Sequence, residues 1–172
     1  MPLTVFVPRN GRDVNKSDLI AKIVANLSAE RDLLAKAARA AHAESTHEQS
    51  KADNKYDTRG LEASYLAHGQ AQQAIEVGET IRRFESLPVR QFADREGADV
   101  GPLVEVDHSG NRTVYLLGPG AGGMEVELDG QDVLVLTPAS PLGRRLMGRK
   151  KGDRVKAEPT GMRPGSVVTN VT

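Results

Sequence analysis

Two long stretches without proline lie on either side of Asp53 and constrain the fold of this chain most. Residues 17–49 contain neither proline nor glycine, and residues 57–87 run without proline to Pro88. In both stretches apolar residues recur every three or four positions, which is the spacing of a coiled-coil seam. The seam positions are Ile20, Ile23, Leu27, Leu34, Ala38 and Ala41 in the first stretch, and Ala63, Ala67, Ala74, Val77, Ile81 and Phe84 in the second. The pattern predicts two helices, and Ser17 is a suitable N-cap for the first.

The distribution of side-chain size along the two seams predicts how the helices pair. Large apolar residues lie far from Asp53 in both stretches, and alanines lie close to it. If the chain reverses at Asp53, Phe84 meets the turn that contains Ile20 and Ile23. Each helix has roughly 34 residues and spans about 50 Å at the usual rise per residue. We therefore expect an antiparallel coiled-coil hairpin. Two helices of a larger bundle are the alternative, although the flanking sequence offers no third helix.

The sequence after Pro88 changes to the period of a β-sheet. Residues 87–97 contain a proline, mixed charges and a glycine, which is typical of a linker. Alternating apolar residues predict strands at 103–108, 112–117, 126–128, 133–137, 154–157 and 166–171. A short helix is expected from Pro141, with Ser140 as its cap. We expect an α+β fold in two parts, with the hairpin in residues 1–90 and the sheet in residues 91–172.

The composition excludes several classes of protein. Basic and acidic residues number 23 each, so the formal net charge is zero. This balance argues against electrostatic binding of nucleic acid over a broad surface, because such binding needs clustered Lys and Arg. The absence of cysteine excludes disulfides, thiolate chemistry and cysteine–zinc sites. The apolar run Leu3–Val7 is too short for a signal-peptide core, and no stretch approaches the ~18 residues of a spanning helix. We therefore expect a cytoplasmic protein.

Small residues at fixed offsets mark the segment from Ser140 to Val155. It reads Ser140-Pro141-Leu142-Gly143, then Gly148, then Gly152-Asp153 before a strand. This segment, downstream of a long helical hairpin, resembles the bacterial Gre family of transcript-cleavage and elongation factors, and the Gre-like RNA polymerase regulators built on the same plan. The resemblance implies an FKBP-like C-terminal domain that docks on RNA polymerase. It also implies a monomer whose hairpin tip enters the secondary channel, with nucleic acid contacted only within the transcription complex.

The resemblance also gives roles to residues at the hairpin tip. Gre factors carry an aspartate and a glutamate three residues apart at the tip, the latter followed by asparagine, with a tyrosine shortly after. Asp53, Asn54 and Tyr56 match the later part, while Ser50 stands where the first acid of the family lies. The spacing from Asn54 to Tyr56 is also one residue shorter than in the family. The candidate acids, which would help the polymerase hold Mg²⁺, are Asp53, Asp57 and Glu48. The candidate tip contacts are Lys51, Asn54, Lys55, Tyr56 and Arg59. No metal or other cofactor is expected in the free protein.

Three functions remain open at this stage. A Gre-like factor would promote transcript cleavage in backtracked complexes through the polymerase's own chemistry, without being an enzyme itself. Because serine replaces the first acid of the family at position 50, the sequence also fits a Gre-like inhibitor that does not stimulate cleavage. A prolyl isomerase would share the fold class of the C-terminal domain. Such isomerases enclose proline in an aromatic-lined pocket, and Tyr115 is nearly the only aromatic residue of this region, which argues against that function.

A basic cluster follows Pro141. Its members are Arg144, Arg145, Arg149, Lys150 and Lys151. Cations are favourable near the C-terminus of a helix, so the cluster is either a solvated helix end or a docking patch for an acidic partner.

Overall fold

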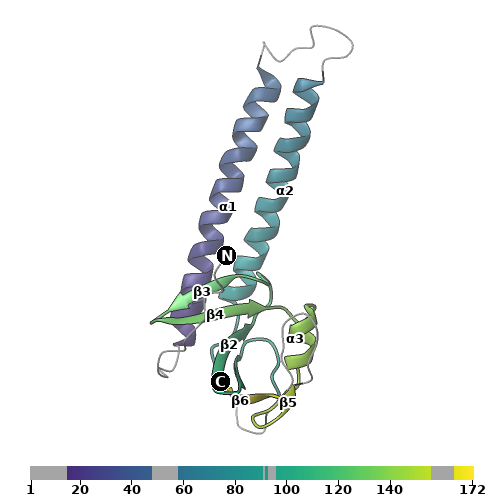
Figure 1. Ribbon diagram of the computed structural model, residues 1–172. Helices are drawn as coiled ribbons and strands as arrows, with labels where there is room; N and C mark the ends of the chain where they lie inside the picture. The colour runs from purple at the N-terminus through teal and green to yellow at the C-terminus, as the bar shows by residue number, and fades with distance from the viewer. Residues whose placement is uncertain (1–14, 48–57, 91, 93–95, 156–164) are drawn as a thin grey trace. The chain divides into compact units, whose positions relative to one another are not determined.

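The computed structural model describes residues 15–47, 58–90, 92, 96–155 and 165–172. Two long helices come first, α1 (Lys16–Thr46) and α2 (Arg59–Glu85), and Figure 1 shows them antiparallel and side by side. The chain forms two compact units, one from Val24 to Arg82 and one from the described residues before and after that range. The second unit therefore contains the base of the hairpin together with the C-terminal sheet. The division between residues 90 and 91 stays a prediction.

The helical hairpin follows the predicted seams. Ile20, Ile23, Leu27, Ala38 and Ala41 are buried on α1, and Ala67, Ile81 and Phe84 are buried on α2. Leu34, Ala63, Ala74 and Val77 are half-buried. A Cβ added to Gly78 would lie 3.9 Å from Cδ of Arg31, and these two residues are nearly equidistant from Asp53 along the chain. The antiparallel pairing expected from the sequence is thus confirmed.

The start of α1 differs from the prediction. Asn15 caps the helix, since its Oδ1 accepts the backbone N–H of Ser17 at 3.0 Å and of Asp18 at 3.4 Å. Ser17 lies inside the first turn. Asn and Ser are nearly equally favourable as N-caps, and the sequence has one of each, two positions apart.

In its described residues, the C-terminal part is a six-stranded sheet with one short helix, so the α+β fold class is confirmed. The strands are β1 (Leu103–His108), β2 (Asn111–Leu117), β3 (Glu125–Leu128), β4 (Gln131–Leu136), β5 (Arg154–Val155) and β6 (Ser166–Val171). Their order in the sheet is β3-β4-β2-β1-β6-β5. β2 and β4 run parallel, and all other neighbours are antiparallel. The helix α3 (Pro141–Leu146) follows β4, as predicted.

The two faces of this sheet bury different sets of side chains. One face carries Val104, Val106, Tyr115 and Leu117, which pack in a single core cluster with Leu146 of α3. Phe92 and Ala98 join the same cluster. Phe92, within the predicted linker, therefore packs on the domain, because its apolar ring is covered there. Val89 of the same segment is exposed.

The opposite face of the sheet is covered by the base of the helical hairpin. The side chain of Phe84 is fully buried, and a Cβ added to Gly118 would lie 3.0 Å from its Cζ and 3.0 Å from Cγ1 of Val135. Lys22 of α1 donates a hydrogen bond to the backbone oxygen of Glu127. Leu116 and Val133, also on this face, are fully buried. The sheet thus has an apolar layer on both sides.

Replacement of Phe84 by alanine should lower the free energy of unfolding by about 3–5 kcal/mol, because the cavity would lie between a helix and a sheet that cannot collapse into it. Urea denaturation followed by circular dichroism measures the change. Ala63→Ser, at a half-buried seam position of the same helix, should cost less than about 1 kcal/mol. Equal losses for the two variants would show that Phe84 does not hold the base of the hairpin.

Candidate functional site

The segment from Ser140 to Gly143 is shaped by a helix cap that only glycine fits. Ser140 Oγ accepts the backbone N–H of Gly143 at 3.0 Å and donates to the backbone oxygen of Thr137 at 2.8 Å. Pro141 occupies the first turn, where its missing N–H costs nothing. A Cβ on Gly143 would lie 1.9 Å from the oxygen of Thr137. The residue types of this segment are therefore set by one tight turn.

The glycines that follow α3 hold a second tight turn. Gly148 has φ of 73° and Gly152 has φ of 93°, both in the left-handed region that glycine adopts without strain. Asp153 Oδ2 accepts the backbone N–H of Lys150 at 3.0 Å, which closes the turn. Gly148 also donates its N–H to the oxygen of Ala98 at 2.6 Å, and Ala98 donates back to Arg149. The motif residues Ser140, Pro141, Gly143, Gly148, Gly152 and Asp153 thus build the scaffold, and Leu142 packs on its core.

Basic side chains are the groups that this scaffold presents to solvent. Arg144, Lys150, Lys151 and Arg154 are exposed. Arg144 Nη1 donates to the oxygen of Ala139 at 2.5 Å, and Arg149 Nε donates to the oxygen of Arg145 at 3.1 Å. The two guanidinium groups are therefore held in place by backbone oxygens.

Gly143→Ala should destabilise the protein by about 1–3 kcal/mol or more, because the added methyl group has no space beside Thr137. Gly69→Ala is the matched control. Gly69 lies in α2 with nothing within 4 Å of an added Cβ, so this change should raise stability by up to about 1 kcal/mol. Thermal unfolding of both variants gives the comparison, and a neutral Gly143→Ala would contradict the role assigned to the turn.

The predicted tip residues lie mostly outside the described part of the chain. Glu48, Lys51, Asp53, Asn54, Lys55, Tyr56 and Asp57 all fall in residues 48–57, and Arg59 is the first residue of α2. On either side of these residues, α1 ends at Thr46 and α2 begins at Arg59. Thr58, just before α2, donates its hydroxyl to Glu62 Oε1 at 2.7 Å. The roles of the tip acids and contacts therefore stay predictions. Within the described ranges, no three His, Cys, Asp or Glu side chains gather as a metal site would require.

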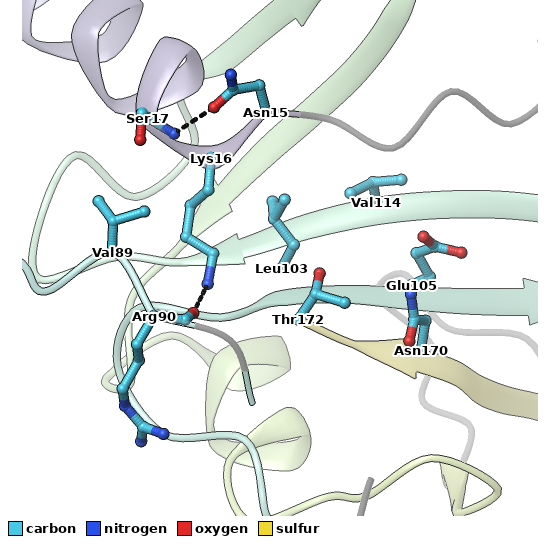
Figure 2. A pocket seen from close by; sticks show the side chains of 10 residues that line it. All are labelled: Asn15, Lys16, Ser17, Val89, Arg90, Leu103, Glu105, Val114, Asn170 and Thr172. Atoms are coloured by element: carbon cyan, nitrogen blue, oxygen red, sulfur yellow. Dashed lines mark hydrogen bonds between the residues drawn. The ribbon is translucent and has the colours of Figure 1, made fainter. Parts of the chain in front are cut away.

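A polar cleft lies beside the N-terminus of α1, on the face of the sheet that the hairpin base covers (Figure 2). Its volume is about 580 Å³. The lining residues are Asn15, Lys16, Ser17, Val89, Arg90, Leu103, Glu105, Val114, Asn170 and Thr172. The cleft mixes both signs of charge with amide and hydroxyl groups.

Lys16 is the most constrained side chain of this cleft, and the sequence did not indicate it. It is only 9% exposed, and its Nζ donates to the backbone oxygen of Arg90 at 2.7 Å (Figure 2). The same Nζ lies 5.0 Å from the centre of the Phe92 ring, and Cζ of Arg90 lies 3.9 Å from it. Burial and the positive charge of Arg90 hold the pKa of Lys16 below its ordinary value of 10.5. Lys16 thus fastens Arg90 and Phe92 to the start of α1.

The lowered pKa of Lys16 predicts how stability changes with pH. Since the folded protein releases this proton at lower pH than the unfolded chain, stability should rise as pH increases through the folded pKa towards 10.5. Lys16→Met should remove that rise, while Lys22→Met should keep it. Urea unfolding of the three proteins across alkaline pH tests this, and parallel curves for wild type and Lys16→Met would contradict it.

The hairpin, the mixed sheet and the capped turn after β4 together define an α+β fold that begins with a long helical hairpin. Among solved structures, the chain is similar to that of the transcription factor Gfh1, with 20% identity over 89% of this chain and 92% of that chain and a TM-score of 0.38. It is also similar to GreA factor homolog 1 (Gfh1) of Thermus thermophilus, with 23% identity over 93% and 96% of the two chains and a TM-score of 0.36. Thermus aquaticus Gfh1 gives 20% identity over 90% and 94%, with a TM-score of 0.36.

No protein-family model matches the chain, and no curated relative matches its sequence. Among the described residues, no helix is long and apolar enough to cross a membrane.

Proposed function

We propose that this protein is a Gre-like factor that binds bacterial RNA polymerase through its C-terminal domain and inserts the hairpin tip into the secondary channel. The observation that carries the proposal is the combination of one long antiparallel hairpin with the turn from Ser140 to Val155. The solved structures to which the chain is similar are described as a transcription factor and as a GreA factor homologue. We place the protein in the cytoplasm, where the polymerase works.

The length of the hairpin suits such a role. α1 has 31 residues and α2 has 27, so the helices span about 40–47 Å. A narrow rod of this length carries a few side chains into a channel that a globular domain cannot enter. The C-terminal domain then serves as the anchor, and the tip reaches the polymerase active site.

At the tip, Asp53 is the side chain proposed to assist transcript cleavage, with Asp57 and Glu48 as further candidates. Carboxylates are the ligands that Mg²⁺ prefers, and a second Mg²⁺ at the polymerase site would activate the attacking water. A pair of acids on an open turn makes a weak oxygen site, so the metal would be held only together with the polymerase's own acids. The protein would thereby change the chemistry of the polymerase without being an enzyme itself.

A second candidate is a Gre-like inhibitor that docks in the same way but does not stimulate cleavage. It is favoured by Ser50, which places a hydroxyl where the family pattern has its first acid. A single remaining acid at Asp53 would occupy the channel with less ability to hold a metal ion.

Asp53→Asn should leave binding to RNA polymerase intact and reduce cleavage in backtracked complexes by about tenfold or more. Asp32→Asn removes an equal charge from an exposed site in α1 and should change neither property. A gel assay of stalled transcription complexes with purified polymerase measures cleavage, and a fluorescence titration measures binding.

The other outcomes of this assay separate the candidates. If Asp53→Asn and wild type stimulate cleavage equally, Asp53 is not the operative acid. If neither stimulates cleavage but both bind and slow elongation, the inhibitor is the correct function, and Ser50→Asp should then restore some cleavage. If wild type does not bind polymerase at micromolar concentration, both candidates are wrong.

A further inference from the structure

The part of the helical hairpin nearest to its turn exposes large apolar side chains. We define the outer part of the hairpin as residues 37–46 and 59–71, which form the upper ends of α1 and α2 in Figure 1. Leu61 is 56% exposed, Tyr65 70% and Leu66 55%. These three residues lie within two turns of α2, and they are half of the six large apolar residues that the described part of the chain exposes. Exposed apolar side chains are therefore concentrated beside the turn.

The pairing of the two helices does not require these side chains. In the outer part the seam consists of alanines, of which Ala41 and Ala67 are buried and Ala63 is half-buried. Leucine is a good helix former, so helix propensity alone favours it on a helix surface, but tyrosine is a poorer helix former than alanine or leucine. Neither seam packing nor helix propensity thus accounts for Tyr65.

Charged residues are sparse in the same part of the hairpin. Its 23 residues include four that are charged, whereas the remaining 35 residues of the two helices include twelve. The four are Arg39, Glu44, Arg59 and Glu62. The buried centre of a protein–protein interface is depleted of charged residues and enriched in tyrosine. The outer part of the hairpin therefore has the composition of a surface that a protein partner covers.

Nucleic acid and a second copy of the chain fit this surface less well. Two cations balanced by two acids give no net attraction for a phosphate backbone. The three exposed side chains offer only a few hundred Å², whereas a stable dimer buries about 800 Å² on each partner. A contact of this size is suited to one part of a larger interface whose remainder lies elsewhere on the protein.

We propose that the outer part of the hairpin is itself a binding surface, on which Leu61, Tyr65 and Leu66 contact an apolar wall of the protein that receives the tip. The inference rests on the proposed function for the identity of that protein, which is RNA polymerase. Tyr65 is the central contact, because a tyrosine ring supplies a large contact area at a low cost in conformational entropy. The wall contact holds the hairpin in place and leaves the tip side chains free to act.

Substitutions by glutamine test the proposal, because glutamine is a good helix former and leaves the charge unchanged. Tyr65→Gln should weaken the Kd for purified bacterial RNA polymerase by about tenfold, and Leu61→Gln by about threefold. The losses should be the same at low and high salt, since apolar contacts are not screened.

Leu33→Gln is the matched control. Leu33 is 68% exposed on α1, nearly as much as Tyr65 on α2, but it precedes the end of α1 by 13 residues or about 20 Å. This variant should bind as wild type does. Thermal unfolding should show that all three variants fold normally.

The outcomes distinguish this inference from the proposed function. If wild type binds polymerase and the Tyr65 and Leu61 variants bind equally well, the outer part is not a binding surface, although the function stands. If Leu33→Gln is as weak as Tyr65→Gln, the effect is not confined to the outer part and the inference is wrong. If the free protein dimerises in analytical ultracentrifugation, and Tyr65→Gln abolishes the dimer but not polymerase binding, the surface joins two copies instead. Failure of the wild type to bind polymerase would overturn both.

Discussion

The contact between Phe84 and the sheet is the interaction on which the rest of the structure depends. The last turn of α2 buries this ring completely beside Gly118 and Val135. Gly118 has no side chain, and the ring occupies the space that a side chain would take. A sheet with one face open to water would expose Leu116 and Val133, and a long hairpin with a free base would expose Leu19 and Ile23. Each part therefore supplies the apolar cover that the other lacks.

Much of this fold could be predicted from the sequence because two different periods of apolar residues occur in it. The three–four spacing identified Ile23, Ile81 and Phe84 as buried, and they are. The alternation in residues 103–108 identified β1 to the residue. A strongly apolar residue such as isoleucine favours a buried position, so its place in a periodic pattern predicts its burial well.

The parts that could not be predicted depend on where distant segments meet. Lys16 is a residue type that is rarely buried, and the return of Arg90 and Phe92 to the start of α1 covers it. Phe92 was the available signal, since a large aromatic ring in a supposed linker needs a place to pack. The cap at Asn15 was missed because Ser17 offered equivalent chemistry two positions later.

The strand order has a consequence for how the protein is made. β6 lies between β1 and β5, and it comes after all other strands in the chain. β1 pairs with β2 through a short turn, whereas the other edge of β1 pairs with β6, far along the chain. That edge therefore stays without its partner until residues 166–171 have been synthesised, although the hairpin arms can pair well before then. Pairing over so long a separation is slow, so this interval is when the nascent chain most needs a chaperone.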